Sequence, residues 1–273
     1  MLESRPQAAL KPRNLVSLLD ETFAVYSRNV RFWIVLVAVV QVPMALVSYV
    51  LAQTWGGAVS VALTGLLSAM GVAYVYAAAL YGVGQHYVTG GIVFRDCHAR
   101  AFWRARSLAA LTLAAGITII ALLSPVSFVD NQVVAALATL AMIPAVAIAV
   151  YWSMAVQAIV VEGNKSVGAL RRSFALVRGN WWRTFGIGLT FLLVAMGLAI
   201  VVSIPFAAVS ALASADPASG VANVILALGQ MTVAVVVPPV LFIGWTLFYY
   251  DMRVRKEEYD VAALSRELGL VAA

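Results

Sequence analysis

Asp96, Cys97 and His98 are consecutive and His86 precedes them, so side chains that could ligate a metal or move protons lie in one stretch. A zinc site needs three or four such ligands, usually in pairs separated by a few residues. These residues do not follow that spacing, and a single cysteine excludes an internal disulfide and a multi-cysteine site. We interpret them as polar residues at a membrane surface, and we expect neither a metal nor a cofactor.

Asp251 is a second candidate for chemistry. It follows two tyrosines and precedes Arg253 and Arg255. A lone carboxylate beside cations is more often a structural ion pair than a catalytic group. We therefore expect Asp251 to pair with a nearby arginine or to cap a neighbouring element, and we assign no catalytic residue.

Basic side chains offer a different chemistry, which is the binding of lipid phosphates. Clusters of Lys and Arg beside membrane helices attract the anionic lipids of the cytoplasmic leaflet. Two such clusters stand out, one in the middle of the chain and one near its end. The residues predicted to hold headgroups are Arg171, Arg172, Arg178, Arg253 and Arg255.

The composition indicates that these residues are positioned by membrane helices. The chain is 63% hydrophobic and 11% charged, whereas a soluble domain carries about a quarter charged residues. A span needs about 20 apolar residues, and the long apolar runs lack the alternation of a membrane β-barrel. We predict an all-α polytopic membrane bundle of six transmembrane helices, at 31–52, 58–88, 106–124, 131–161, 183–213 and 221–250.

The charges alternate along the chain. All 18 Lys and Arg residues belong to the segment before the first predicted span or to the segments after the second, fourth and sixth, if Arg31, Arg106 and Arg183 at the first positions of spans are counted with the segments that precede them. The other connections contain only Asp130 and Asp216 as charged residues. The positive-inside rule places basic segments in the cytoplasm. We predict one membrane domain over 1–273, with 1–30 and 251–273 cytoplasmic on either side of 31–250. Because this rule accounts for the net charge of +6, we expect no nucleic-acid partner.

The basic segments also carry apolar stripes. Residues spaced by three and four share one face of a helix, and such basic amphipathic helices lie in the membrane interface. Two segments align without gaps and a weaker copy covers Ala99–Arg106, so we predict three units of amphipathic helix plus transmembrane hairpin, with a final amphipathic helix in Val254–Leu270. The two clear stripes are Val16, Leu19, Phe23, Tyr26, Val30 and Trp33, and Val167, Leu170, Phe174, Val177 and Trp181.

Three segments resemble a known family. They are LLDETFAVY at 18–26, ALRRSFALVRGNWWR at 169–183 and FYYDMRVRKEEYD at 248–260. They are similar to the membrane domain attached to some bacterial glycerophosphoryl diester phosphodiesterases, and the resemblance covers nearly the whole chain. It implies a multi-pass protein of the bacterial cytoplasmic membrane in a lipid context. In that family a separate soluble domain carries the phosphodiesterase chemistry, and we expect none in this chain.

Three functions remain open from the sequence. The first is a non-catalytic membrane module that binds anionic lipid, a protein partner or a second copy of itself. The second is a transporter or channel for a lipid or an uncharged solute, since five prolines (Pro43, Pro144, Pro205, Pro238 and Pro239) lie inside predicted spans and could mark hinges. The third is an intramembrane enzyme acting on lipid headgroups, which would require Asp96, His98 and Asp251 to meet in space.

Overall fold

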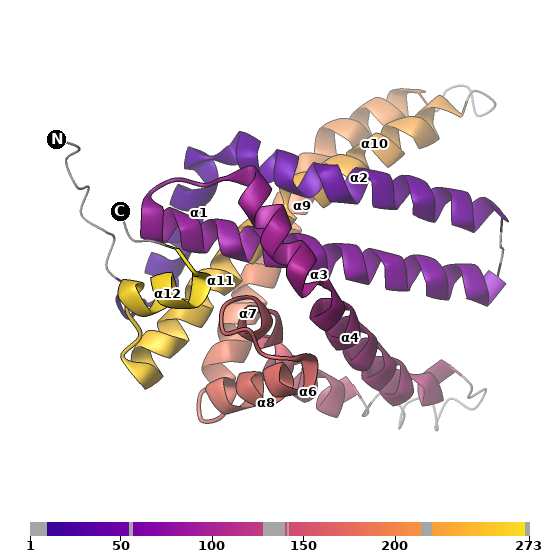
Figure 1. Ribbon diagram of the computed structural model, residues 1–273. Helices are drawn as coiled ribbons and strands as arrows, with labels where there is room; N and C mark the ends of the chain where they lie inside the picture. Colours follow the sequence, from indigo (N-terminus) through magenta and orange to yellow (C-terminus); the bar gives the residue numbers. More distant parts are fainter. Residues whose placement is uncertain (1–9, 55–56, 128–139, 141, 214–219, 271–273) are drawn as a thin grey trace.

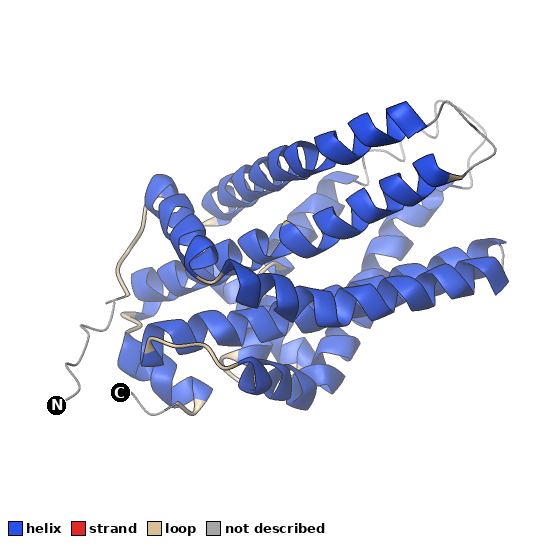
Figure 2. Ribbon diagram, turned by 90° about the horizontal axis from the view of Figure 1, so that it is seen from above, coloured by secondary structure: helices blue, strands red, loops and turns tan. Residues whose placement is uncertain are grey.

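The computed structural model describes residues 10–54, 57–127, 140, 142–213 and 220–270. Throughout these residues the regular structure is helical, which confirms the predicted all-α bundle (Figures 1 and 2). The helices are α1 (Leu15–Arg28), α2 (Val30–Thr54), α3 (Gly57–Thr89), α4 (Phe94–Ser127), α6 (Met142–Trp152), α7 (Ala155–Val160), α8 (Ser166–Val177), α9 (Trp181–Ala213), α10 (Val221–Val236), α11 (Pro238–Glu257) and α12 (Val261–Leu268).

Five helical segments of the described chain are long and apolar enough to cross a membrane, and the chain is accordingly a multi-pass helical membrane protein. They correspond to five of the six predicted spans. Of the span predicted over 131–161, residues 131–139 and 141 lie outside the described residues, and the part from Met142 is divided into α6 and α7. The remaining one, 106–124, lies within α4, so a total of six stays a prediction. The five segments are Val30–Leu51, Ser60–Thr89, Met142–Val160, Trp181–Ala213 and Val221–Glu257.

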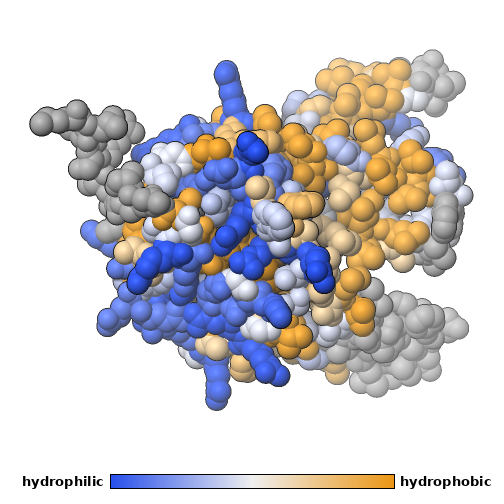
Figure 3. All heavy atoms as spheres, viewed as in Figure 1, coloured by the Kyte–Doolittle hydropathy of each residue, from blue (hydrophilic) through white to orange (hydrophobic). Residues whose placement is uncertain are grey.

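The bundle has an apolar half and a polar half. α2 packs against α3, α3 against α4, and α9 against α10, and these long helices extend to one side of the molecule (Figure 1). Hydrophobic side chains cover that side, whereas hydrophilic ones gather over α8, α11 and α12 (Figure 3). Large apolar side chains on the long helices, such as Val47, Ile200 and Leu228, are exposed, as expected for a surface that faces lipid.

The core lies where the polar half meets the long helices. α11 runs through it and contacts α1, α2, α3, α8, α9 and α10. Its side chains are buried from Pro239 to Arg253 with few exceptions. The largest fully buried side chains include Trp33, Phe191, Tyr249 and Tyr250, and Trp33 donates its indole N–H to the carbonyl of Val25 at 3.2 Å. Aromatic packing therefore joins the spans at their polar end.

Two predicted segments differ from the structure near the end of the chain. The span predicted over 221–250 is interrupted, because α10 ends at Val236 and α11 begins at Pro238, which has no N–H to continue the ladder. The boundary predicted at residue 251 is also displaced, because α11 continues to Glu257. Glu258 then adopts a left-handed φ of 54°, and this ends the helix before α12 begins.

The third amphipathic copy differs from the first two. α1 is separated from α2 at Asn29, and α8 from α9 at Arg178–Asn180. Ala99–Arg106 instead continues without interruption into the apolar part of α4. Asn29 and Gly179 are poor helix formers, whereas the alanines and arginines of the third copy are good ones, so no break forms there.

Candidate functional site

α1 and α8 present apolar side chains to their surroundings in the same way. Asn14 caps α1 by accepting a hydrogen bond from the Ser17 N–H at 2.8 Å, and the helix buries Leu18 and Val25 against the bundle. Val16 remains 64% exposed and Phe23 is exposed as well. The face of α1 that packs inside the protein is therefore mostly different from the apolar stripe predicted from the sequence.

The matching positions of α8 repeat this arrangement. Ala169, Ser173 and Leu176 are buried, whereas Val167 is 64% exposed and Phe174 is also exposed. Val16 and Val167, and Phe23 and Phe174, occupy equivalent places in the two aligned segments. The two helices thus offer equivalent apolar surfaces beside the long helices they precede.

Exposed aromatic side chains also occur in the third turn of α4 and in the first turn of α9. Trp103 of α4 is 82% exposed and Trp182 of α9 is 78% exposed. Phe102 is exposed beside Trp103, and the two rings meet edge to face. Amphipathic aromatic side chains collect at the membrane–water boundary. We call Val16, Phe23, Phe102, Trp103, Val167, Phe174 and Trp182 the interfacial surface.

The five predicted headgroup residues lie in two different settings. Arg171 and Arg178 are exposed on and after α8, and the structure records no ion pair for either within the described residues. Arg172 instead contacts Glu162 at 2.8 Å and Glu257 at 2.5 Å. Burial alone would lower the pKa of Arg172, but the hydrogen bonds and charges of these two carboxylates raise it.

Arg253 and Arg255 are also held by carboxylates. Arg253 forms a bidentate pair with Glu267, at 2.6 and 3.0 Å, and its guanidinium carbon lies 3.7 Å from the centre of the Tyr259 ring. Burial, followed by a hydrogen bond to Glu267, raises the pKa of Tyr259. Arg255 donates to Asp251 at 3.1 Å. Of the five arginines, Arg171 and Arg178 are therefore the two without a carboxylate partner in the described chain.

Asp251 is the centre of a second group of contacts. It has no exposed surface, and Arg183 approaches its carboxylate at 2.7 Å. The backbone N–H of Arg13 donates to the same carboxylate at 2.6 Å, while Arg183 and Arg255 both donate to the Arg13 carbonyl. The expected pairing of Asp251 with an arginine is confirmed. The network fastens the segment before α1 to the ends of α9 and α11.

Asp96, His98 and Asp251, the three residues that a headgroup enzyme would require together, each have different partners. Asp96 accepts from the Gln85 amide at 3.3 Å. His98 stacks on Tyr74, and burial lowers its pKa. Asp251 is engaged by Arg13, Arg183 and Arg255 as described. No trio of His, Cys, Asp or Glu suited to a metal is found within the described residues.

Cys97 and His86 have different surroundings. Cys97 is fully buried, and burial, followed by the charge of Asp96, raises the pKa of its thiol to about 12. A thiol with so little thiolate at neutral pH is a poor nucleophile. His86 lines a hollow of about 380 Å³ between α1 and α3, together with Asp20 and Glu21.

Several residues of the ion-pair network were not singled out from the sequence. Glu162, Glu257 and Glu267 neutralise Arg172 and Arg253, and Arg13 and Arg183 meet at Asp251. The sequence feature that could have indicated these ion pairs is the presence of acidic residues inside the basic segments. Arg172 and Glu257 are far apart in sequence, as are Arg183 and Asp251, so spacing alone could not pair them.

A family model described as a domain of unknown function (DUF7847) matches residues 87–251. The match runs from the last residues of α3 to Asp251 in α11, and therefore includes α8 and its basic segment. No curated protein and no solved structure matches the chain.

Proposed function

The chain belongs to the DUF7847 family, whose model covers more than half of it, and from that premise we propose that it is a non-catalytic membrane module that binds anionic lipid headgroups at the cytoplasmic face of a bacterial plasma membrane. Arg171 and Arg178 would be the principal headgroup-binding residues. The observation that carries the proposal is the exposure of these two arginines beside the exposed apolar residues Val167 and Phe174.

Each type of exposed side chain on α8 has a favourable partner in a membrane. Val167 and Phe174 are unfavourable in water but favourable at the acyl boundary, which a helix lying in the interface reaches. A lipid phosphate is a good partner for a guanidinium, because charge-assisted hydrogen bonds are strong. Arg171 and Arg178 have no carboxylate partner in the described chain, so an anionic lipid would complete their contacts.

The orientation is part of the same proposal. All basic segments lie at the ends of the predicted spans that share one side, and the positive-inside rule assigns that side to the cytoplasm. α1 and α12 both lie in the hydrophilic half of the molecule (Figures 1 and 3). A reporter that fluoresces only in the cytoplasm should be dark when inserted after Asp216 and bright when fused after Leu270. The reverse pattern would refute the orientation.

Two further observations support the proposal. The three segments that resemble the phosphodiesterase-associated membrane domain include both basic clusters, and that domain lies in a lipid context. The carboxylates of the buried Asp251 and the partly buried Glu162 are each paired with arginines, which favours a structural role for both.

The lipid preference can be measured on the full chain. The protein would be reconstituted in bilayers of phosphatidylcholine with a minority of phosphatidylglycerol, extracted with its surrounding lipid, and the extracted lipid analysed by mass spectrometry. We expect phosphatidylglycerol to be enriched over the starting bilayer. A basic residue near an anionic surface contributes about 1 kcal/mol, so R171Q/R178Q should reduce the enrichment severalfold.

A matched control removes the same charge elsewhere. K11Q/R266Q also deletes two exposed cations, but neither is on α8 or next to it. It should retain most of the enrichment. Equal losses in the two double variants, or no enrichment in the unaltered protein, would contradict the proposal.

A further inference from the structure

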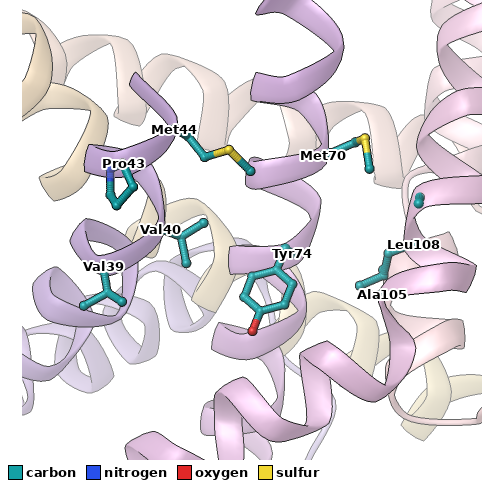
Figure 4. A pocket seen from close by; sticks show the side chains of 9 residues that line it. Val39, Val40, Pro43, Met44, Met70, Tyr74, Ala105 and Leu108 are labelled. Carbon is teal, nitrogen blue, oxygen red and sulfur yellow. The ribbon is translucent and has the colours of Figure 1, made fainter. Parts of the chain in front are cut away.

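An apolar cavity of about 430 Å³ lies between α2, α3 and α4 (Figure 4). Met44 and Met70 line one end and Tyr74 the other, while α4 contributes small side chains to the opposite wall (Figure 4). The volume is within the range of small-molecule sites. Its lining includes Val39, Met44, Met70, Tyr74, Ala105 and Ala109.

The cavity opens towards the membrane near the middle of the candidate span on α2. Val39 at its edge is 52% exposed, and it lies on the candidate span Val30–Leu51. It comes nine residues after the start of α2, which is about 14 Å along a helix. The hydrocarbon core is about 30 Å thick, so with the proposed orientation Val39 lies close to the bilayer centre, which the acyl chains of cytoplasmic-leaflet lipids reach.

The lining favours an apolar occupant. The Tyr74 hydroxyl already donates to the His98 carbonyl at 3.2 Å, and the other side chains named above have no strong hydrogen-bonding group. Met44 and Met70 are flexible and polarisable, so they can adapt to an irregular chain. Ala105 and Ala109 leave room on α4. These features suit an acyl chain better than a polar solute.

A cation on α4, Arg106, directly follows the cavity-lining residue Ala105. Phe102, Arg106 and Ala109 are spaced by four and three residues and therefore share one face of α4. Helical side chains lean towards the N-terminus of their helix, so the exposed Arg106 leans from the level of the cavity towards the predicted cytoplasmic surface. No ion pair of Arg106 is recorded in the described part of the chain. This position suits a phosphate.

We propose that the cavity binds one acyl chain of an anionic phospholipid of the cytoplasmic leaflet, with Arg106 beside the phosphate. The site differs from the headgroup contacts of Arg171 and Arg178 in location and in the part of the lipid that it holds. It rests on the membrane orientation of the proposed function and not on the headgroup contacts of Arg171 and Arg178.

The test uses the full chain in bilayers that contain phosphatidylglycerol with a photoreactive diazirine in its acyl chain. After illumination, labelled peptides are quantified by mass spectrometry. Label at Met44 and Met70 is divided by label at Leu192 and Leu193, which are exposed on α9 and report ordinary lipid contact. We expect the ratio to exceed unity in the unaltered protein.

Two substitutions on α4 separate the cavity from the general lipid surface. A109F fills the cavity and should lower the ratio about tenfold, whereas A110F places the same ring on the adjacent exposed position and should leave it unchanged. A105L fills less space and should give an intermediate value if A109F misfolds. Equal ratios in A109F, A105L and A110F would overturn the proposal.

The role of the headgroup is tested with R106Q. This variant should lower labelling by the phosphatidylglycerol probe severalfold and leave labelling by a matched phosphatidylcholine probe unchanged. Labelling of the cavity by a diazirine fatty acid but not by phosphatidylglycerol would also overturn the proposal. R171Q/R178Q should leave the cavity ratio intact while it lowers lipid enrichment, so the two proposals can fail independently.

Discussion

The carboxylate of Asp251 lies 2.7 Å from the guanidinium of Arg183 and joins α11 to the first turn of α9. The two side chains differ in environment, because Asp251 has no exposed surface and Arg183 is 28% exposed. The Arg13 N–H donates to the same carboxylate. Three segments that are distant in sequence are therefore held by one buried charge.

D251N should destabilise the protein substantially. The amide keeps the shape of the side chain but leaves Arg183 and Arg255 without their counter-charge. Removing one partner of a buried ion pair costs about 3–5 kcal/mol. Because these arginines are partly exposed, we expect a cost at the lower end of that range. Thermal unfolding in detergent should show a clearly lower midpoint. D20N, which alters an exposed carboxylate on α1, should change it little, and a D251N midpoint equal to that of D20N would contradict the structural role.

R253K should loosen α12. Lysine keeps the charge but cannot form the two parallel hydrogen bonds to Glu267 or stack on Tyr259 as a planar guanidinium does. Amide hydrogen exchange in Val261–Leu268 should accelerate about tenfold, which corresponds to about 1.4 kcal/mol, while exchange in α9 stays unchanged. R266K provides the control, because Arg266 is exposed on α12 itself. Unchanged protection of α12 in R253K would show that Arg253 does not anchor it.

G244A should disturb the contact between α9 and α11. A β-carbon at Gly244 would overlap the ring of Phe191, which is fully buried and has little room to move. Overpacking of this kind costs about 1–3 kcal/mol. The measurement is the unfolding midpoint compared with that of G186A. A β-carbon at Gly186 meets nothing within 4 Å, and alanine favours a helix, so G186A should be neutral or stabilising. Equal midpoints would refute the tight contact.

His98 should make stability depend on pH below neutrality. Burial lowers its pKa in the folded protein from the ordinary 6.5, so the unfolded chain takes up the proton first as the pH falls. Its neutral form therefore contributes stability above about pH 6.5 that is lost as the pH falls through the folded pKa. The unfolding midpoint of the unaltered protein should fall more than that of H98Q between pH 7.5 and 5. Parallel losses would contradict this origin.

The apolar spans could be predicted closely because the bilayer imposes a length on them. The predictions 31–52 and 183–213 differ by at most two residues at each end from α2 and α9. The interruption at Val237 was harder to foresee. Pro238 and Pro239 were visible in the sequence, but proline can kink a helix or end it, and the packing of α11 decides which occurs.

The basic residues illustrate what sequence spacing cannot resolve. The pairing of Asp251 with Arg255 is local, at four residues, and was expected. Arg172 looked equivalent to Arg171 and Arg178, yet it meets Glu257 from a distant helix. Whether an arginine faces a carboxylate or a lipid depends on tertiary contacts, so the assignment of all five arginines to headgroups stays a prediction.

The bond between the Arg13 N–H and Asp251 spans 238 residues. A ribosome that adds about 5–20 residues per second needs about 10–50 s to make that length. During this time α1 is present without the carboxylate that later holds the segment before it. The segment before α1 therefore stays without this contact, at the water–lipid boundary or with a chaperone, until the last long helix has been synthesised.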